Sequence, residues 1–157
     1  MVPTIVCAVD WDDDGSPEPL RVAADLAARL DRPLVVAHVA PMGPYGPGGA
    51  VVAPAPAMPY PYPIAPEVGE LQGARDEARR RVEQLLADCG IEDAEVEVVL
   101  DTTPADGLRR VAKDRDAELL IVGSHGRGLL RAALAGDTSH ALVGEAPCPI
   151  VVVPAAS

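Results

Sequence analysis

The chain has 157 residues, a length that predicts a single domain over residues 1–157 with a substantial hydrophobic core. Its 13 basic and 24 acidic residues give a net charge of -11, which argues against binding to nucleic acid or to an anionic membrane surface, because both would repel it. Hydrophobic residues make up 48% of the chain, a share that excludes an intrinsically disordered protein.

The first part of the chain predicts two buried strands separated by a helix. Thr4 to Val9 is an apolar run rich in β-branched residues, which suits a strand covered on both faces. A second strand of this kind is expected over Leu34 to Val39. Between them, Ser16-Pro17 predicts an N-cap followed by proline at the first helical position. The helix that follows carries apolar residues at helical spacing, namely Leu20, Ala23, Ala24, Ala27 and Leu30.

Residues 41–66 differ in composition from the rest of the chain. These 26 residues carry no charge but hold nine prolines, four glycines and all three tyrosines. Repeated proline disfavours regular strand pairing, so the segment predicts a long loop leaving the carboxyl end of the second strand. Parallel sheets bind ligands at that end, so the loop either covers such a crevice or is a surface insertion with no binding role.

After this loop, strands and helices continue to alternate. A helix is expected from about Glu67 to Ala87, and a strand with one exposed face, at a sheet edge, over Glu95 to Leu100. Thr103-Pro104 predicts a capped helix start. Apolar strands are expected over Glu118 to Val122 and over Ile150 to Val153. The alternation predicts an α/β fold, a five-stranded parallel sheet with helices on both faces.

A cluster of glycines follows the strand that ends at Val122. Gly123, Gly126 and Gly128 fall within six residues, and Gly136 follows before a predicted helix. Glycine lacks a Cβ, so successive N–H groups of such a loop can converge on an anion, and the start of the helix would add its own N–H groups. The pattern is neither a Walker A loop nor G-x-G-x-x-G, so plain turns are the alternative.

In its spacing this segment resembles the signature of the universal stress protein family, G-x2-G-x9-G followed by Ser or Thr. Gly123, Gly126 and Gly136 are separated by two and nine residues, as the signature requires. The segment GSHGRG, followed further along the chain by APCPIVVV, is typical of that family. The resemblance covers nearly the whole chain. It implies a Rossmann-like fold, similar to that of adenine nucleotide alpha hydrolases, which binds ATP or AMP in a stress-response or regulatory role.

The resemblance also implies where each part of the nucleotide would bind. Ala8, Val9 and Asp10 would lie beside the base and ribose, and Val39 would contact adenine through its backbone. A carboxylate at a strand end can accept both ribose hydroxyl protons, which gives Asp10 a chemical role; capping the next turn is its alternative. The residues implied around the phosphates are Gly123, Ser124, Gly126, Arg127, Gly136, Asp137, Thr138 and Ser139.

Two carboxylates depart from the family pattern. Asp137 stands where the family has Ser or Thr, and Asp12 stands where its first-strand motif has Ser. A carboxylate about 4 Å from a phosphate repels it by roughly 4 kcal/mol at an effective dielectric constant of about 20, so ATP is expected to bind weakly or with a metal. Mg²⁺ between carboxylates and phosphates would relieve the repulsion, and Asp137 capping the last helix is the alternative.

The aspartates after the first strand also fit two other patterns. Asp10 and Asp12 resemble the nucleophile and general acid of haloacid-dehalogenase-like phosphatases, but Asp13-Asp14 replaces the Gly-Thr that follows them there. Asp10, Asp12 and Asp14 match the opening of a calcium loop, but its twelfth position is Arg21 where the metal needs a glutamate. An enzymatic role beyond slow ATP hydrolysis is therefore not expected.

The last strand bears on assembly. An unpaired apolar edge is an association site, and members of the family commonly pair edge to edge, so a homodimer through Ile150 to Val153 is expected. A strand buried within one subunit is the alternative. A dimer that binds no nucleotide and acts through partners is the main rival function.

Histidines, cysteines and apolar runs add further expectations. His38 and His125 are expected to be structural, because neither has an evident nucleophile partner in the sequence. The three cysteines, Cys7, Cys89 and Cys148, lack metal-binding spacing and are expected to be reduced thiols. No targeting signal precedes the first strand and no apolar stretch reaches 18 residues, so a cytoplasmic location is expected.

Overall fold

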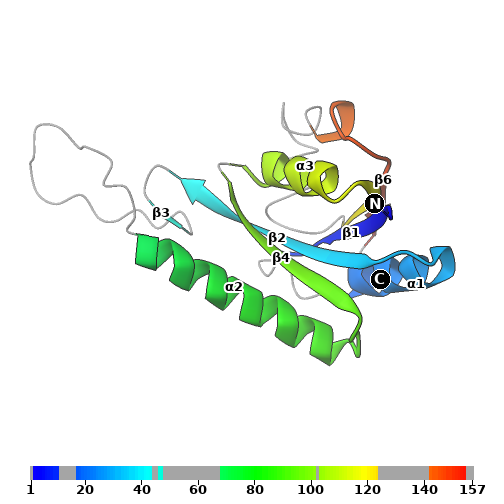
Figure 1. Cartoon of the computed structure of the whole chain (residues 1–157), viewed down its shortest axis with the longest axis horizontal. Helices are drawn as coiled ribbons and strands as arrows, with labels where there is room; N and C mark the ends of the chain where they lie inside the picture. The colour runs from blue at the N-terminus through cyan, green and yellow to red at the C-terminus, as the bar shows by residue number, and fades with distance from the viewer. Residues whose placement is uncertain are drawn as a thin grey trace, which may run out of the picture.

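The computed structural model describes residues 2–10, 17–43, 46–47, 68–101, 103–123 and 142–154 (Figure 1). Strands and helices alternate along these residues, as the sequence predicts. The elements are β1 (Thr4–Ala8), α1 (Glu18–Leu30), β2 (Leu34–Gly43), β3 (Gly46–Pro47), α2 (Val68–Asp88), β4 (Ala94–Asp101), α3 (Pro104–Asp114), β5 (Ala117–Gly123) and β6 (Ile150–Val153). A further turn of helix covers residues 142–144.

Five of these strands form one parallel sheet, in the order β4-β2-β1-β5-β6. β1 lies at its centre, where Ile5 pairs with Leu34 of β2 on one side and with Leu119 of β5 on the other. The predicted five-stranded parallel sheet is therefore confirmed, and β4 lies at an edge, as its pattern indicates. β3 is an addition to the prediction, since its two residues pair antiparallel with the end of β2.

Helices cover both faces of the sheet, and each face has its own hydrophobic core (Figure 1). On one face, Leu20 of α1 and Val82 of α2 pack against the sheet. On the other face, Leu108 of α3 and Leu142 of the helical turn do so. All four side chains are at most 2% exposed. Because successive residues of β1 point into different cores, a slip of one residue would exchange its whole set of contacts, which fixes the register of the sheet.

The start of α1 differs from the prediction. Pro17 occupies the N-cap position, no side-chain hydrogen bond caps the helix, and Ser16 lies outside the described residues. Pro19 is the proline of the first turn, and the N–H of Arg21 donates to the carbonyl of Pro17 at 3.0 Å. Pro17 and Pro19 are compatible both with the predicted start, which has Pro17 at the first helical position, and with the observed one, because the first residues of a helix need no N–H partner within it. Glu18 supplies a negative charge that favours the helix N-terminus.

β2 is longer than predicted and takes in the first residues of the expected loop. Residues 41–43 belong to β2, and Pro41 pairs with Asp101 of β4. The prediction that the loop starts at residue 41 is therefore wrong. Among the described strands, β1 pairs with β2 only as far as Ala37, so no described strand on that side needs an N–H from Pro41. Residues 48–66 of the predicted loop lie outside the described residues.

The helices after this segment follow the prediction closely. α2 buries Ala78, Val82 and Leu86 along one face. α3 begins at the predicted cap, where the Oγ1 of Thr103 accepts the N–H of Asp106 at 3.2 Å. Of the helices in the described ranges, none is long and apolar enough to cross a membrane.

All three cysteines are free thiols, in line with the prediction. Cys7 lies in β1 with none of its surface exposed, and burial raises the pKa of its thiol to about 12. Partial burial also raises the pKa of Cys148 above its ordinary value. Since the thiolate is the reactive form, Cys7 acts as a small apolar core residue rather than as a nucleophile.

Candidate functional site

The carboxyl ends of β1 and β5 lie side by side at one edge of the sheet, next to the part of β2 that follows Ala37, because these strands are parallel and adjacent. β1 connects along the chain toward β2 on one side, while β5 lies on its other side, so the strand order reverses here. Open parallel sheets bind ligands at such a point. This edge carries the predicted site residues that the structure describes, which are Ala8, Val9, Asp10, Val39 and Gly123.

Both backbone groups of Val9 are held by β2. Its N–H donates to the carbonyl of Ala37 at 2.9 Å, and its carbonyl lies 2.9 Å from Nδ1 of His38. A carbonyl only accepts, so Nδ1 of His38 must carry the proton. The imidazole is 5% exposed, and the bond gives His38 a structural contact directly beneath the predicted site. Val9 therefore contributes packing at this edge, while Asp10, the next residue, is half-buried.

Val39 is fixed by a close approach of α3 to β2. Gly107 lies in α3, and a Cβ added there would lie 2.6 Å from Cγ1 and 2.8 Å from Cγ2 of Val39. The absence of a side chain at Gly107 therefore lets the helix pack directly on the predicted adenine contact. Sequence reasoning missed this residue; a lone glycine inside a helical pattern was the available signal.

The first turn of α3 lies at the same edge, and two of its N–H groups are already engaged. The N–H groups of Asp106 and Gly107 bond to Oγ1 and the carbonyl of Thr103, at 3.2 and 3.1 Å. The hydroxyl of Thr103 donates to the carboxylate of Asp106 at 2.7 Å, and this bond, together with Arg109, lowers the pKa of Asp106. Arg109 also pairs with Glu145, which ties α3 to the segment after the helical turn. This helix start is therefore capped from within.

The rest of the predicted site lies outside the described residues. This applies to Ser124, Gly126, Arg127, Gly136, Asp137, Thr138 and Ser139, and also to Asp12 and His125. Among the described residues, no cluster of three or more His, Cys, Asp or Glu side chains could hold a metal ion. Of the predicted site, the structure therefore describes the residues expected beside the base and ribose, together with Gly123.

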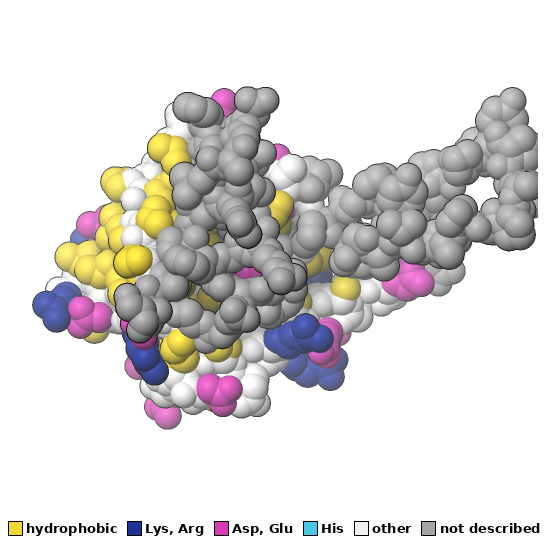
Figure 2. All heavy atoms as spheres, turned by 180° about the vertical axis from the view of Figure 1, so that it is seen from behind, with side chains coloured by type: hydrophobic (Ala, Val, Ile, Leu, Met, Phe, Trp, Pro, Cys, Tyr) yellow, Lys and Arg dark blue, Asp and Glu magenta, His cyan; other side chains and the backbone are white. Residues whose placement is uncertain are grey.

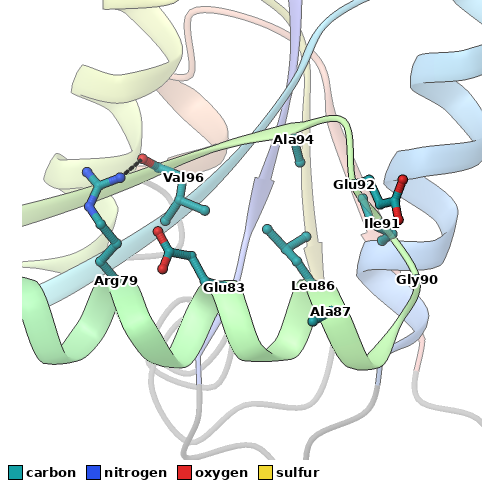
Figure 3. Close-up of a pocket in the computed structure, with 9 residues that line it drawn as sticks. All are labelled: Arg79, Glu83, Leu86, Ala87, Gly90, Ile91, Glu92, Ala94 and Val96. Atoms are coloured by element: carbon teal, nitrogen blue, oxygen red, sulfur yellow. Dashed lines mark hydrogen bonds between the residues drawn. The ribbon is translucent and has the colours of Figure 1, made fainter.

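A separate hollow of about 520 Å³ lies between the last turns of α2 and the first half of β4 (Figure 3). Leu86 and Val96 point into it, and Arg79 donates to the carbonyl of Val96 at 3.0 Å. Its lining residues are Arg79, Glu83, Leu86, Ala87, Gly90, Ile91, Glu92, Ala94 and Val96. It is distant from the carboxyl edge of the sheet, because β4 begins here. No sequence pattern predicted it, since it arises where two elements pack.

Residues 1–154 match the sequence model described as the universal stress protein family. A universal stress protein of Mycobacterium tuberculosis is 30% identical over 151 residues, which are 95% of this chain and 47% of that relative. A second, of Mycobacterium bovis, matches equally well. The chain therefore spans about half the length of these relatives.

Solved structures share the fold. A universal stress protein in complex with cAMP has a TM-score of 0.60 and 19% identity, over 99% of this chain and 98% of that one. The universal stress protein from Archaeoglobus fulgidus in complex with dAMP has a TM-score of 0.55 and 19% identity, over 98% of this chain and 99% of that one. At this identity the likeness shows the Rossmann-like α/β architecture.

Proposed function

Because the chain belongs to the universal stress protein family, we propose that it binds an adenine nucleotide, ATP or AMP, in a stress-response or regulatory role. The observation that carries the proposal is the convergence of Asp10 and Val39 at the point where the strand order reverses. Two structural neighbours, complexes with cAMP and dAMP, hold adenine nucleotides on the same fold, which supports this choice of ligand.

Each described residue has a distinct role in the proposal. Asp10 accepts the ribose hydroxyl protons, because a carboxylate at a strand end is suited to a diol. Val39 contacts adenine through its backbone, and its position is set by the helix that packs on it at Gly107. Ala8 and Val9, at most 8% exposed, form the apolar base of the site.

The phosphates are proposed to bind the glycine segment that begins where β5 ends. Its members are Gly123, Ser124, Gly126, Arg127, Gly136, Asp137, Thr138 and Ser139. Asp12 and Asp137 bring negative charge to this segment, and at about 4 Å each would oppose a phosphate by roughly 4 kcal/mol. We therefore expect Mg²⁺ to accompany ATP, since it takes one or two carboxylates together with phosphate oxygens.

Calorimetric titration tests the nucleotide proposal. ATP is titrated into the protein with Mg²⁺, without Mg²⁺, and without Mg²⁺ into Asp137→Ser. ATP is expected to bind at least about tenfold more weakly in the second titration than in the other two. Tenfold corresponds to about 1.4 kcal/mol, which is less than the repulsion of roughly 4 kcal/mol expected from one carboxylate. Equal affinity in all three would contradict the charge argument, and no binding in any would contradict the nucleotide proposal.

Asp10→Asn isolates the ribose contact. It is expected to weaken AMP binding about tenfold, because a hydrogen bond to a charged group contributes about 1.5 to 3 kcal/mol. Asp114→Asn is the matched control, since Asp114 is an exposed carboxylate in the last turn of α3, at the opposite end of the sheet. Equal losses in the two variants would point to overall charge and not to a ribose contact.

A homodimer that acts through partners is the second candidate, and the edge position of β6 favours it. β6 pairs only with β5 among the described strands, and Val152 is 48% exposed. Hydrophobic side chains gather on the flank where β6 lies, at the left of Figure 2. We propose that two copies associate along this edge.

Two further expectations from the sequence belong to the proposal. Residues 1–157 form one domain, and the protein works in the cytoplasm.

A further inference from the structure

His38 holds the peptide bond that leads into Asp10. The carbonyl oxygen that accepts from its Nδ1 belongs to Val9, and in the same planar peptide unit the nitrogen belongs to Asp10. The bond measures 2.9 Å, and the imidazole is 5% exposed, so solvent competes little for it. His38 therefore contacts the segment one peptide away from the proposed ribose-binding carboxylate.

Past the end of β1, a hydrogen bond from this imidazole takes the place of the backbone hydrogen bonds that join β1 to β2 within the sheet. The last paired residues of β1 and β2 are Ala8 and Ala37, and the N–H of Val9 still donates to the carbonyl of Ala37. The carbonyl of Val9 is instead taken by the ring of His38. With its carbonyl held, the planar peptide also fixes the direction in which Asp10 leaves the sheet.

We infer that His38 is a positioning residue of the nucleotide site, which sets the Val9–Asp10 peptide so that the carboxylate of Asp10 meets the ribose hydroxyls. The inference rests on the proposed function. It assigns His38 no contact with the ligand and no proton transfer. Its effect should therefore appear in the recognition of ribose and not in the recognition of the base or phosphates.

Two amide variants separate this role from simple packing. In His38→Asn the amide nitrogen occupies the δ position, like Nδ1, and can still donate to the carbonyl of Val9. In His38→Gln the nitrogen occupies the ε position, so the donor is displaced. Each variant is titrated with ATP and with 2′-deoxy-ATP under the Mg²⁺ condition that gives binding, and folding is checked by circular dichroism.

The test compares, for each variant, the dissociation constant of 2′-deoxy-ATP divided by that of ATP. In the wild-type protein, 2′-deoxy-ATP is expected to bind roughly tenfold more weakly than ATP, because one hydrogen bond to a charged group is lost. His38→Asn should keep this ratio, while His38→Gln should bring it to within about twofold of one. If His38→Gln does not fold, His38→Met takes its place.

Val82→Ala is the control for lost stability, because Val82 of α2 is buried in the same core as Val9 but has no side-chain donor for the Val9 carbonyl. It should leave the ratio unchanged. An unchanged ratio in folded His38→Gln would overturn the inference, as would an equal fall in Val82→Ala or in His38→Asn. Failure of the wild-type protein to bind any nucleotide is a distinct result, which overturns the proposed function itself and removes the basis of the inference.

Discussion

Gly107 of α3 packs directly on Val39 of β2 near the proposed site. A Cβ at Gly107 would fall 2.6 Å from Cγ1 of Val39, well inside normal contact distance. Val39 is β-branched and 6% exposed, so its side chain has little freedom to turn away. Helix propensity and packing therefore oppose each other at this position.

Gly107→Ala should lower the free energy of unfolding by about 1 kcal/mol, since overpacking costs about 1 to 3 kcal/mol and alanine recovers about 1 kcal/mol of helix propensity. Urea denaturation measures the change. Gly73→Ala in α2 is the matched control, because nothing lies within 4 Å of a Cβ there, and it should raise stability by up to about 1 kcal/mol. Gly107→Ala proving as stable as Gly73→Ala would contradict the packing argument.

Arg115 joins the end of α3 to the edge strand β4. It donates to Glu95 at 2.8 Å and to Glu97 at 2.7 Å, and its side chain is 31% exposed. The hydrogen bond from Arg115 is the main reason why the pKa of Glu95 lies below its ordinary value. A lowered pKa stabilises the fold above the ordinary pKa of glutamate, and this stabilisation is lost as the pH falls through the lowered value.

Arg115→Gln should therefore lower the free energy of unfolding by about 1 kcal/mol at pH 7. This is at the upper end of the range for surface ion pairs, because the pair is partly buried and belongs to a network. The difference from the wild-type protein should shrink as the pH falls below the ordinary glutamate value of 4.5. Denaturation at a series of pH values measures it. Arg29→Gln removes an exposed pair with Asp25 and should change stability little at any pH. A constant difference across the pH range would rule out the linkage to Glu95.

At the residue level, the sequence predicted contacts that are local in the chain. Thr103 was expected to cap α3 because its partner, Asp106, lies three residues away. The contact of Gly107 with Val39, and that of His38 with Val9, join separate elements, so no local pattern indicates them. The predicted ribose and adenine residues were placed by family resemblance, and the structure brings Asp10 and Val39 to one edge of the sheet.

Arginines from two helices bind backbone carbonyls along β4, at one edge of the sheet. Along β4, Arg79 of α2 donates to the carbonyl of Val96 at 3.0 Å, and Arg110 of α3 donates to that of Leu100 at 3.3 Å. These carbonyls point to the same side of the strand, away from β2. Two arginines from opposite faces of the sheet therefore occupy acceptors that another strand would use.

Removing both guanidinium groups should open this edge. The double variant Arg79→Ala/Arg110→Ala is expected to form larger species than the wild-type protein as concentration rises, because an exposed ladder edge pairs with other strands. Size-exclusion chromatography with light scattering measures this. Arg80→Ala/Arg81→Ala is the control, since it makes the same charge change while Arg80 and Arg81 pair with Glu77 within α2. Identical behaviour of the two double variants would contradict the role of the edge arginines.

Elements with a strong periodic or β-branched pattern could be predicted from the sequence, and their boundaries less well. β6 was predicted at its observed bounds, because its apolar run lies between prolines at both ends. The start of α1 was misplaced, since two prolines fit the first turn in more than one register. The extension of β2 through Pro41 was missed, because it depends on which side of the strand lacks a partner.

At the scale of the whole molecule, we expect two copies to associate along the β6 edge. Val152→Glu is expected to convert the proposed homodimer to monomer, because it places a charge beside its own copy along the β6 edge. Sedimentation velocity measures the change. Val143→Glu is the control, since Val143 is 65% exposed on the helical turn and adds the same charge away from the strand. A wild-type monomer, or an unaltered dimer in Val152→Glu, would argue against association through β6.

During synthesis, β1 is completed long before the strand that covers its second side. Ile5 pairs with Leu119, and at about 5–20 residues per second the intervening chain takes roughly 6 to 23 s to leave the ribosome. Until then the apolar run from Ile5 to Ala8 can pair on one side only, with β2. A nascent chain with such an uncovered strand is prone to aggregate, so we expect its production in cells to draw on chaperones until β5 emerges.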